Sequence, residues 1–184
     1  MGKKCCFTGY RPQKLAYLRE ETGREYRELY DVLTEQIKAA VDRGYDYFIS
    51  GFAEGVDLMA AEIVIALKRD GYEISLEAAM PAMNQTEGWE DLSRGIYYML
   101  LDQADRRVCV DKTMNKYSCL RRDEYMVDQS DLVIAVFDGK KGGTAYTVNY
   151  ARKKNRDLWI IDPQDRSVTK EEGLFSEVLN CFGA

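Results

Sequence analysis

The sequence contains no histidine among its 184 residues. This absence excludes the nucleophile systems that pair a serine or a cysteine with histidine, and it removes the commonest metal ligand of proteins. Any catalysis would have to use carboxylates, arginine, lysine, tyrosine or groups of the substrate itself. We therefore expect no metal site.

Cysteine is also sparse, with five residues, an odd number, and no CxxC spacing. Cys5 and Cys6 are adjacent, so on a strand they would point to opposite faces. This pattern does not indicate a disulfide framework or a zinc site. We expect buried, reduced thiols.

Long apolar runs are missing as well. No stretch approaches the roughly 20 residues that span a bilayer, and Thr8, Gly9, Tyr10 and Arg11 interrupt any apolar core of a signal peptide. We therefore expect a cytoplasmic protein without a membrane partner. The net charge of -5 argues against a general nucleic-acid binder, so we expect no nucleic-acid partner.

Strand and helix signals alternate along the chain. Short apolar strands are predicted at residues 4–7, 45–49, 74–80 (stopped by Pro81), 107–110, 132–137 and 158–161. Apolar residues spaced three and four apart predict helices at 26–41, 56–67, 90–103 and 120–127, from residue 144 onward, and at 174–181. Gly44 and Gly71 lie where C-terminal caps are expected.

Six short strands separated by helices predict an α/β fold, a single Rossmann-like, doubly wound domain over residues 1–184. Its sheet should be mostly parallel, with helices on both faces. Ligands of such sheets bind beyond the carboxyl ends of the strands, near the point where strand order reverses. Three loops at this edge have unusual compositions.

The most informative loop follows the apolar run VIAVF and has the sequence DGKKGGT. Gly142, Gly143 and Thr144 lead into a helix, whose free N–H groups and positive dipole end attract phosphate. The GK[ST] order of a Walker A motif is missing, so the loop does not predict Mg-dependent NTP hydrolysis. A plain glycine-rich connection is the alternative.

The second loop is TGYRP, directly after the first strand. Thr8 supplies a hydroxyl, Gly9 permits close approach of the backbone, and Arg11 offers a fork of donors that suits phosphate or carboxylate. An ordinary turn with a solvated arginine explains the same residues equally well.

The third loop, SGFAEGVD, contains Ser50, Gly51, Gly55 and Asp57 but lacks the GxGxxG fingerprint of dinucleotide sites. Asp57 falls in the first turn of the next helix. It either stabilises the helix start or accepts a hydrogen bond from a ribose or a base.

Arg122 and a group of aromatic residues each allow a functional and a structural interpretation. Arg122 either faces the pocket or belongs to a charged helix face. The aromatic residues Trp89, Tyr97 and Tyr98 either stack a base or pack in the core. Three special loops at one sheet edge favour a shared pocket.

The motifs TGYRP (8–12), SGFAEGVD (50–57), RRDEYMVDQSD (121–131) and DGKKGGT (138–144) together resemble the SLOG superfamily, which joins DprA/Smf and Lonely Guy proteins. The chain is most similar to its small, bacterial YpsA-like branch. The resemblance implies a Rossmann-like homo-oligomer that binds a nucleotide or a nucleotide-derived ligand, such as a nucleoside monophosphate or a molecule of the NAD or ADP-ribose type. The implied site comprises Thr8, Gly9, Arg11, the 50–57 loop, Arg122, Gly142, Gly143 and Thr144.

Some Lonely Guy proteins are phosphoribohydrolases that carry a glutamate two or three residues after the threonine of the glycine loop. Here Ala145, Tyr146 and Thr147 follow Thr144. We therefore assign no catalytic residue and no required cofactor, and we expect binding or sensing of the ligand without turnover.

Two alternative functions remain. In a Lonely Guy-like phosphoribohydrolase, Arg122 with Asp57 or Glu54 would act on a nucleoside monophosphate. In DprA-like binding of single-stranded DNA, a basic face would form from Lys140, Lys141, Arg152, Lys153, Lys154 and Arg156.

Overall fold

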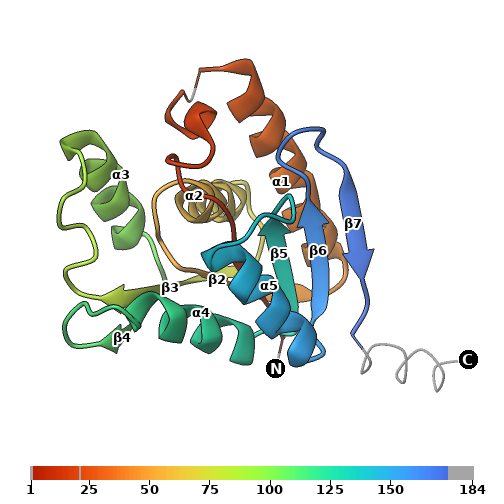
Figure 1. Cartoon of the computed structure of the whole chain (residues 1–184). Coiled ribbons are helices and arrows are strands. Elements are labelled where there is room, and N and C mark those ends of the chain that lie inside the picture. The colour runs from red at the N-terminus through yellow and green to blue at the C-terminus, as the bar shows by residue number, and fades with distance from the viewer. Residues whose placement is uncertain (1, 21, 174–184) are drawn as a thin grey trace, which may run out of the picture.

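The computed structural model describes residues 2–20 and 22–173 and is built around a seven-stranded sheet (Figure 1). Its strand order is β4-β3-β2-β1-β5-β6-β7. The strands are β1 (Lys3–Thr8), β2 (Tyr45–Ser50), β3 (Ser75–Ala82), β4 (Arg106–Asp111), β5 (Leu132–Val136), β6 (Asp157–Ile161) and β7 (Val168–Glu171). All neighbours pair in parallel except β6 and β7, so the predicted α/β class with a mostly parallel sheet is confirmed.

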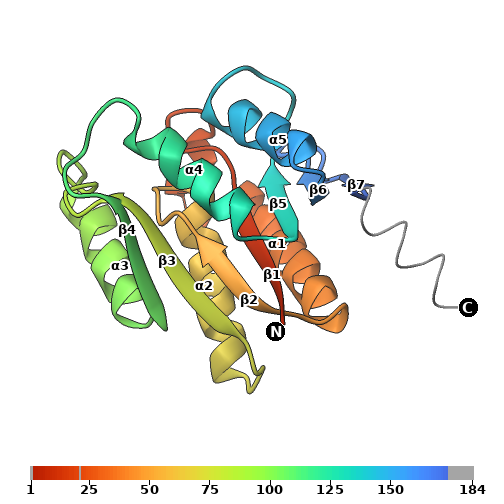
Figure 2. The same cartoon turned by 90° about the horizontal axis from the view of Figure 1, so that it is seen from below.

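Helices cover both faces of the sheet (Figure 2). One face carries α1 (Arg24–Asp42), α2 (Val56–Arg69) and α3 (Asp91–Asp102), and the other carries α4 (Ser118–Asp128) and α5 (Gly143–Lys153). The chain runs from β1 to β4 in one direction and from β5 to β6 in the other. Right-handed crossovers then place the two sets of helices on opposite faces.

The order of the strands reverses between β1 and β5. These two strands pair directly, with Thr8 opposite Ala135 at the carboxyl end of the ladder. Their following connections leave toward opposite faces of the sheet, which opens a crevice at this edge. The loops after β1 and β5 and the starts of α2 and α5 therefore all lie near one point.

The core has two parts, one on each face of the sheet. Cys5 of β1 packs with the α1–α3 side, whereas Cys6 packs with the α4–α5 side, so the predicted opposite orientation of the two thiols is confirmed. Burial raises the pKa of both thiols, that of Cys6 to about 12. The four cysteines within the described residues are all free.

The element boundaries differ from prediction at a few places. Strand β3 continues through Pro81 to Ala82, because its pairing with β2 ends at Ala78 and only β4 accompanies it further. Strand β7 and a short 3₁₀ helix, η1 (Ala16–Arg19), were not predicted. The predicted helix 174–181 lies outside the described residues. Gly44 and Gly71 have φ values of 84° and 94°, which fits their predicted places after helix ends.

Candidate functional site

A cavity of about 340 Å³ opens at the carboxyl end of β1, where the strand order reverses. Four segments contribute to it: the loop after β1, the start of α2, the first half of α4 and the first turn of α5. Its lining consists of Thr8, Gly9, Tyr10, Arg11, Gln13, Lys14, Ala53, Asp57, Cys119, Leu120, Arg122, Asp123, Gly143 and Thr144.

Seven of the predicted ligand-binding residues line this cavity, namely Thr8, Gly9, Arg11, Asp57, Arg122, Gly143 and Thr144. The other four, Ser50, Gly51, Gly55 and Gly142, do not line it. The predicted convergence of the loops on one hollow therefore holds for residues of the first and third loops and for Asp57 of the second.

Ser50 and Gly51 lie outside the cavity but contact two of its lining residues, Asp57 and Arg122. The Ser50 hydroxyl donates to the Asp57 carbonyl oxygen at 2.7 Å and accepts from the Phe52 N–H at 3.2 Å. The Gly51 carbonyl accepts a hydrogen bond from Arg122 Nη1. A Cβ atom on Gly51 would lie 1.8 Å from that nitrogen, so only glycine leaves room for the guanidinium here.

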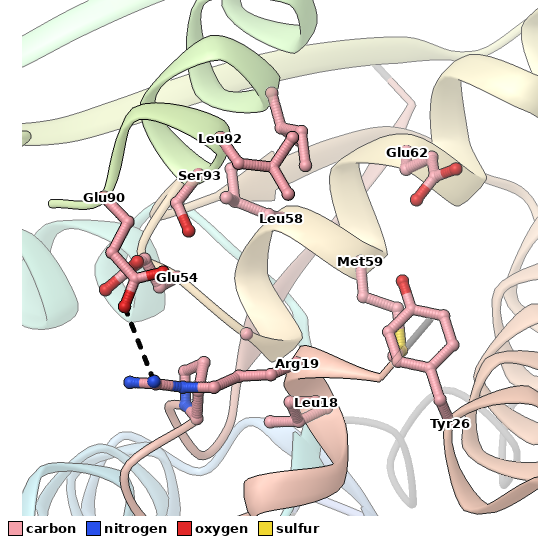
Figure 3. Close-up of a pocket in the computed structure, with 13 residues that line it drawn as sticks. Leu18, Arg19, Tyr26, Glu54, Leu58, Met59, Glu62, Glu90, Leu92 and Ser93 are labelled. Atoms are coloured by element: carbon pink, nitrogen blue, oxygen red, sulfur yellow. Dashed lines mark ion pairs between the residues drawn. The ribbon is translucent and has the colours of Figure 1, made fainter. Parts of the chain in front are cut away.

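Gly55 and Glu54 line a second, smaller cavity of about 140 Å³ between η1, α1, α2 and α3 (Figure 3). Gly55 has a φ of 92°, and an added Cβ would lie 2.6 Å from the Tyr10 carbonyl oxygen. The Glu54 side chain lies near Glu90 and Arg19. Glu54 is therefore not available as a carboxylate for the first cavity.

Arg122 is the buried charged centre of the first cavity, with a relative exposure of 4%. Its Nε donates to Asp123 Oδ1 at 2.7 Å, and its Nη1 lies 3.5 Å from Asp57 Oδ2. Burial opposes the charge of Arg122, but Asp123 and Asp57 outweigh this effect and raise its pKa. Arg122 thus stays a cation and is not part of a solvated helix face.

The neighbouring Arg121 behaves differently. It is exposed and pairs with Asp111 on β4. Of the three nitrogens of the Arg122 guanidinium, Nη2 alone has no hydrogen-bond partner among the described residues, and Arg122 lines the cavity. A ligand in the cavity can therefore accept a hydrogen bond from this buried cation.

Asp57 is a buried carboxyl group opposite that cation. Burial raises its pKa to about 6, the attraction of Arg122 works against this shift, and the nearby charge of Asp123 adds to it. The protonation of Asp57 therefore changes close to neutral pH.

The start of α5 supplies donors for an anion. The first intrahelical amide bond there runs from Tyr146 to Gly142, at 3.0 Å, so the amides of Gly143, Thr144 and Ala145 have no acceptor within the helix. The Thr144 hydroxyl donates to the Gly9 carbonyl at 3.1 Å and joins this helix to the loop after β1. Amides and the helix dipole together favour negative charge at this end of the cavity.

Gly142 precedes this turn with a φ of 147°. An added Cβ on Gly142 would lie 2.6 Å from Lys14 Nζ, which donates to the Lys141 carbonyl at 2.9 Å. Lys14 thus adds a cation beside the α5 turn, and Arg11 adds a second cation to the lining next to Cys119 of α4.

Several lining residues were missed by sequence analysis, among them Lys14, Cys119 and Asp123. Cys119, Arg122 and Asp123 are three and four residues apart, which places them on one face of α4. Given Arg122 as a candidate, this spacing alone predicts that Cys119 and Asp123 face the same cavity.

Of the three aromatic residues, Tyr97 belongs to the core, Trp89 is partly buried against it, and Tyr98 is 53% exposed. The Tyr97 ring is buried and makes edge contacts with Trp89 at 5.6 Å and with Tyr98 at 5.1 Å. None of the three lines the first cavity, so they do not stack a base there, and core packing explains Tyr97 and Trp89.

Within residues 2–20 and 22–173, no helix has the length and apolar character that crossing a membrane requires. The same residues contain no group of three or more cysteine, aspartate or glutamate side chains that could hold a metal ion.

Comparison with known proteins shows relatives along most of the chain. A UPF0398 protein of Halalkalibacterium halodurans is 29% identical over 171 residues, which are 89% of this chain and 89% of that protein. A UPF0398 protein of Bacillus thuringiensis is 31% identical over 159 residues, covering 83% of this chain and 84% of that protein.

Among solved structures, DNA processing protein A from Helicobacter pylori, described with a single-stranded DNA binding mode, has a TM-score of 0.57 at 18% identity. The match covers 98% of this chain and 73% of that one. DNA processing protein A from Streptococcus pneumoniae also has a TM-score of 0.57, at 15% identity, and here the match covers 88% of this chain but 50% of that one. At these identities the likeness concerns the fold alone.

A family model named YpsA and described as the YspA SLOG family matches residues 5–166. The match includes all four motifs on which the resemblance rested. The chain therefore belongs to the YpsA SLOG family.

Proposed function

We propose that this protein binds a nucleotide or a nucleotide-derived phosphate ligand in the cavity between β1 and β5, without turnover. The observation that carries the proposal is the convergence of Arg11, Lys14 and Arg122 with the α5 amide turn on one hollow. Membership of the SLOG family and the Rossmann-like sheet support the same reading.

The cavity has a cationic part and an acceptor part. A phosphate at the α5 turn would have the free amides and the nearby Lys14 as donors, and Arg11 and Arg122 line the same cavity. Asp57 and Asp123 carry carboxylate oxygens that accept hydrogen bonds from sugar hydroxyls or base amino groups. Hydrogen bonds to charged groups contribute about 1.5–3 kcal/mol each, and micromolar affinity corresponds to roughly -8 kcal/mol. A few such contacts, together with packing of the ligand against the cavity wall, are therefore enough for micromolar binding.

Titration calorimetry with AMP, NAD, ADP-ribose and cyclic dinucleotides tests the proposal. We expect saturable binding of at least one of these, weakened about tenfold in Arg11→Ala because one charge-assisted contact is lost. Arg19→Ala is the matched control, since Arg19 lies in the second cavity beside Glu90. Absence of binding across the panel, or equal affinity of the two variants, would contradict the proposal.

Phosphoribohydrolase activity is the second candidate, favoured by one observation. Asp57 and Asp123 both lie within reach of Arg122 in the cavity, although no glutamate stands two or three residues after Thr144. Carboxylates beside a phosphate-binding cation suit the cleavage of an N-glycosidic bond. Release of free adenine from AMP over hours at high protein concentration would establish this activity in place of simple binding.

Single-stranded DNA binding is the third candidate, because DNA processing protein A from Helicobacter pylori shares the fold. The basic face is partly neutralised: Lys140 pairs with Asp138, Arg152 with Glu171 and Lys154 with Asp128. We therefore place this function below nucleotide binding. A mobility shift with oligo-dT that weakens steeply as salt rises would reverse this order.

A further inference from the structure

Cys119 is a thiol inside the cavity that the proposed function leaves without a role. It is the second residue of α4, is partly exposed and lines the cavity. Its Sγ accepts a hydrogen bond from Arg11 Nη2 at 3.9 Å. The other described cysteines are elsewhere: Cys5 and Cys6 are buried, and Cys109 is exposed on β4.

The surroundings of Cys119 attract anions. Arg11 touches the sulfur, and Lys14 lines the same hollow. The cations of the lining, Arg11, Lys14 and Arg122, outnumber its carboxylates, Asp57 and Asp123, and a concave site with net positive charge raises the local concentration of small anions. Cys109 has a different environment. Its thiol donates to the backbone carbonyl of Asp111 at 3.1 Å, and burial, followed by the negative charge of the Asp111 side chain, raises the pKa of this thiol.

Thr8 gives independent evidence that the cavity takes a ligand. Its side chain lines the cavity with a relative exposure of 6%. Across residues 2–20 and 22–173 no group forms a hydrogen bond with its hydroxyl. The hydroxyl oxygen is not one of the fully buried polar atoms without a partner, so it is exposed to the cavity and available to a molecule that enters it.

We propose that Cys119 is a modification site within this cavity, selective for small anionic thiol-reactive compounds, and that its modification excludes the ligand. The proposal rests on the function proposed above, since the same cations serve both roles. A negatively charged adduct on Cys119 would occupy the anion position beside Arg11.

Iodoacetate is a suitable probe because it carries a carboxylate and reacts by a simple displacement. The Cys119 sulfur, as thiolate, attacks the methylene carbon, so that an S–C bond forms while the C–I bond breaks. Iodide leaves with the bonding pair, and the thiol proton goes to solvent. Neutral iodoacetamide reacts by the same step and isolates the effect of charge.

The experiment compares rates of the two reagents at each cysteine by mass spectrometry of the intact, folded protein. We expect the iodoacetate-to-iodoacetamide rate ratio at Cys119 to exceed that at Cys109 by about tenfold. In Arg11→Ala this excess should fall several-fold, whereas Arg19→Ala should keep it. Equal iodoacetate-to-iodoacetamide rate ratios at Cys119 and Cys109, in the protein without substitutions, would overturn the inference.

A second measurement separates this inference from the proposed function. ADP-ribose should slow carboxymethylation of Cys119 but not of Cys109. The carboxymethylated protein should bind ADP-ribose at least tenfold more weakly, and Cys119→Ser should bind normally after the same treatment. Unchanged binding after carboxymethylation would refute exclusion of the ligand. Charge selectivity without binding of any nucleotide would leave the modification site in place and contradict nucleotide binding instead.

Discussion

Two threonines near the cavity differ in one respect that mutation can measure. Thr8 and Thr147 are both buried, with relative exposures of 6% and 0%. The Thr147 hydroxyl donates to Asp123 Oδ2 at 3.2 Å, with the Gly143 carbonyl at 3.1 Å as a second acceptor. The Thr8 hydroxyl has no such acceptor in the described part of the chain. Valine has nearly the same shape as threonine and removes only the hydroxyl.

The two replacements should therefore change stability differently. In Thr147→Val the Asp123 carboxylate loses a donor, and a broken buried hydrogen bond of this kind costs about 1–3 kcal/mol. In Thr8→Val a hydroxyl without a partner is replaced by a methyl group, so the free energy of unfolding should stay unchanged or rise by up to about 1 kcal/mol. The predicted gap between the two variants is thus roughly 1–4 kcal/mol.

Equilibrium unfolding in urea, followed by circular dichroism, measures this gap, provided that the slope with denaturant stays the same. Nucleotide titration of the same samples adds a second readout, in which Thr8→Val should bind several-fold more weakly although it is no less stable. A loss of more than about 1 kcal/mol in Thr8→Val would show that its hydroxyl has a structural partner, and the argument for an available donor would fail.

Three further changes test the site and the fold. Gly51→Ala should destabilise the protein by about 1–3 kcal/mol in thermal or urea unfolding, because the new methyl group meets Arg122 Nη1 at 1.8 Å; a loss below about 0.5 kcal/mol would contradict the close approach. Gly95→Ala, on the exposed face of α3 with no atom within 4 Å of the added Cβ, should instead stabilise by about 0.5–1 kcal/mol. Asp57→Asn should change the pH dependence of stability. A carboxyl with a raised pKa stabilises the fold only while protonated, so its contribution is lost as pH rises from about 4 to 6, and the variant should gain about 1 kcal/mol relative to the parent between pH 5 and 7.5. A difference that is constant over this range would mean that Asp57 titrates at its ordinary pKa.

The parts of the fold that the sequence predicted are those with a strong apolar signal. Strands β1, β2, β3, β5 and β6 contain buried apolar residues that form short apolar runs in the sequence. Strand β4 lies at the edge of the sheet with no buried residue, and its signal is the short run from Val108 to Val110. Strand β7 has the sequence VTKE and is half exposed at the end of the sheet, so it lacks an apolar run and was missed. Its place depends on the hairpin with β6, which is a tertiary contact and not a local pattern.

The candidate site divides in a similar way. Residues at the carboxyl end of a strand, such as Thr8 and Gly9, were predictable because ligands of such sheets bind beyond that end. Glu54, a candidate carboxylate only for the enzyme alternative, lines the second cavity, and the positive φ of Gly55 beside it is a local turn that no apolar pattern reveals. Lys14 was missed because its position depends on the irregular path of the chain between β1 and η1, which no periodic pattern describes.

Strand β4 has a consequence for the behaviour of the protein at high concentration. It is the last strand on its side of the sheet, and its outer backbone groups have no neighbouring strand within the described residues. Such a rim can template the addition of further chains and lead to fibrils. Here Arg106 and Arg107 are exposed near one end of the strand, and stacking them in register would bring like charges together. Charged side chains at a sheet edge disfavour edge-to-edge pairing, so the two arginines oppose growth of the sheet at this rim.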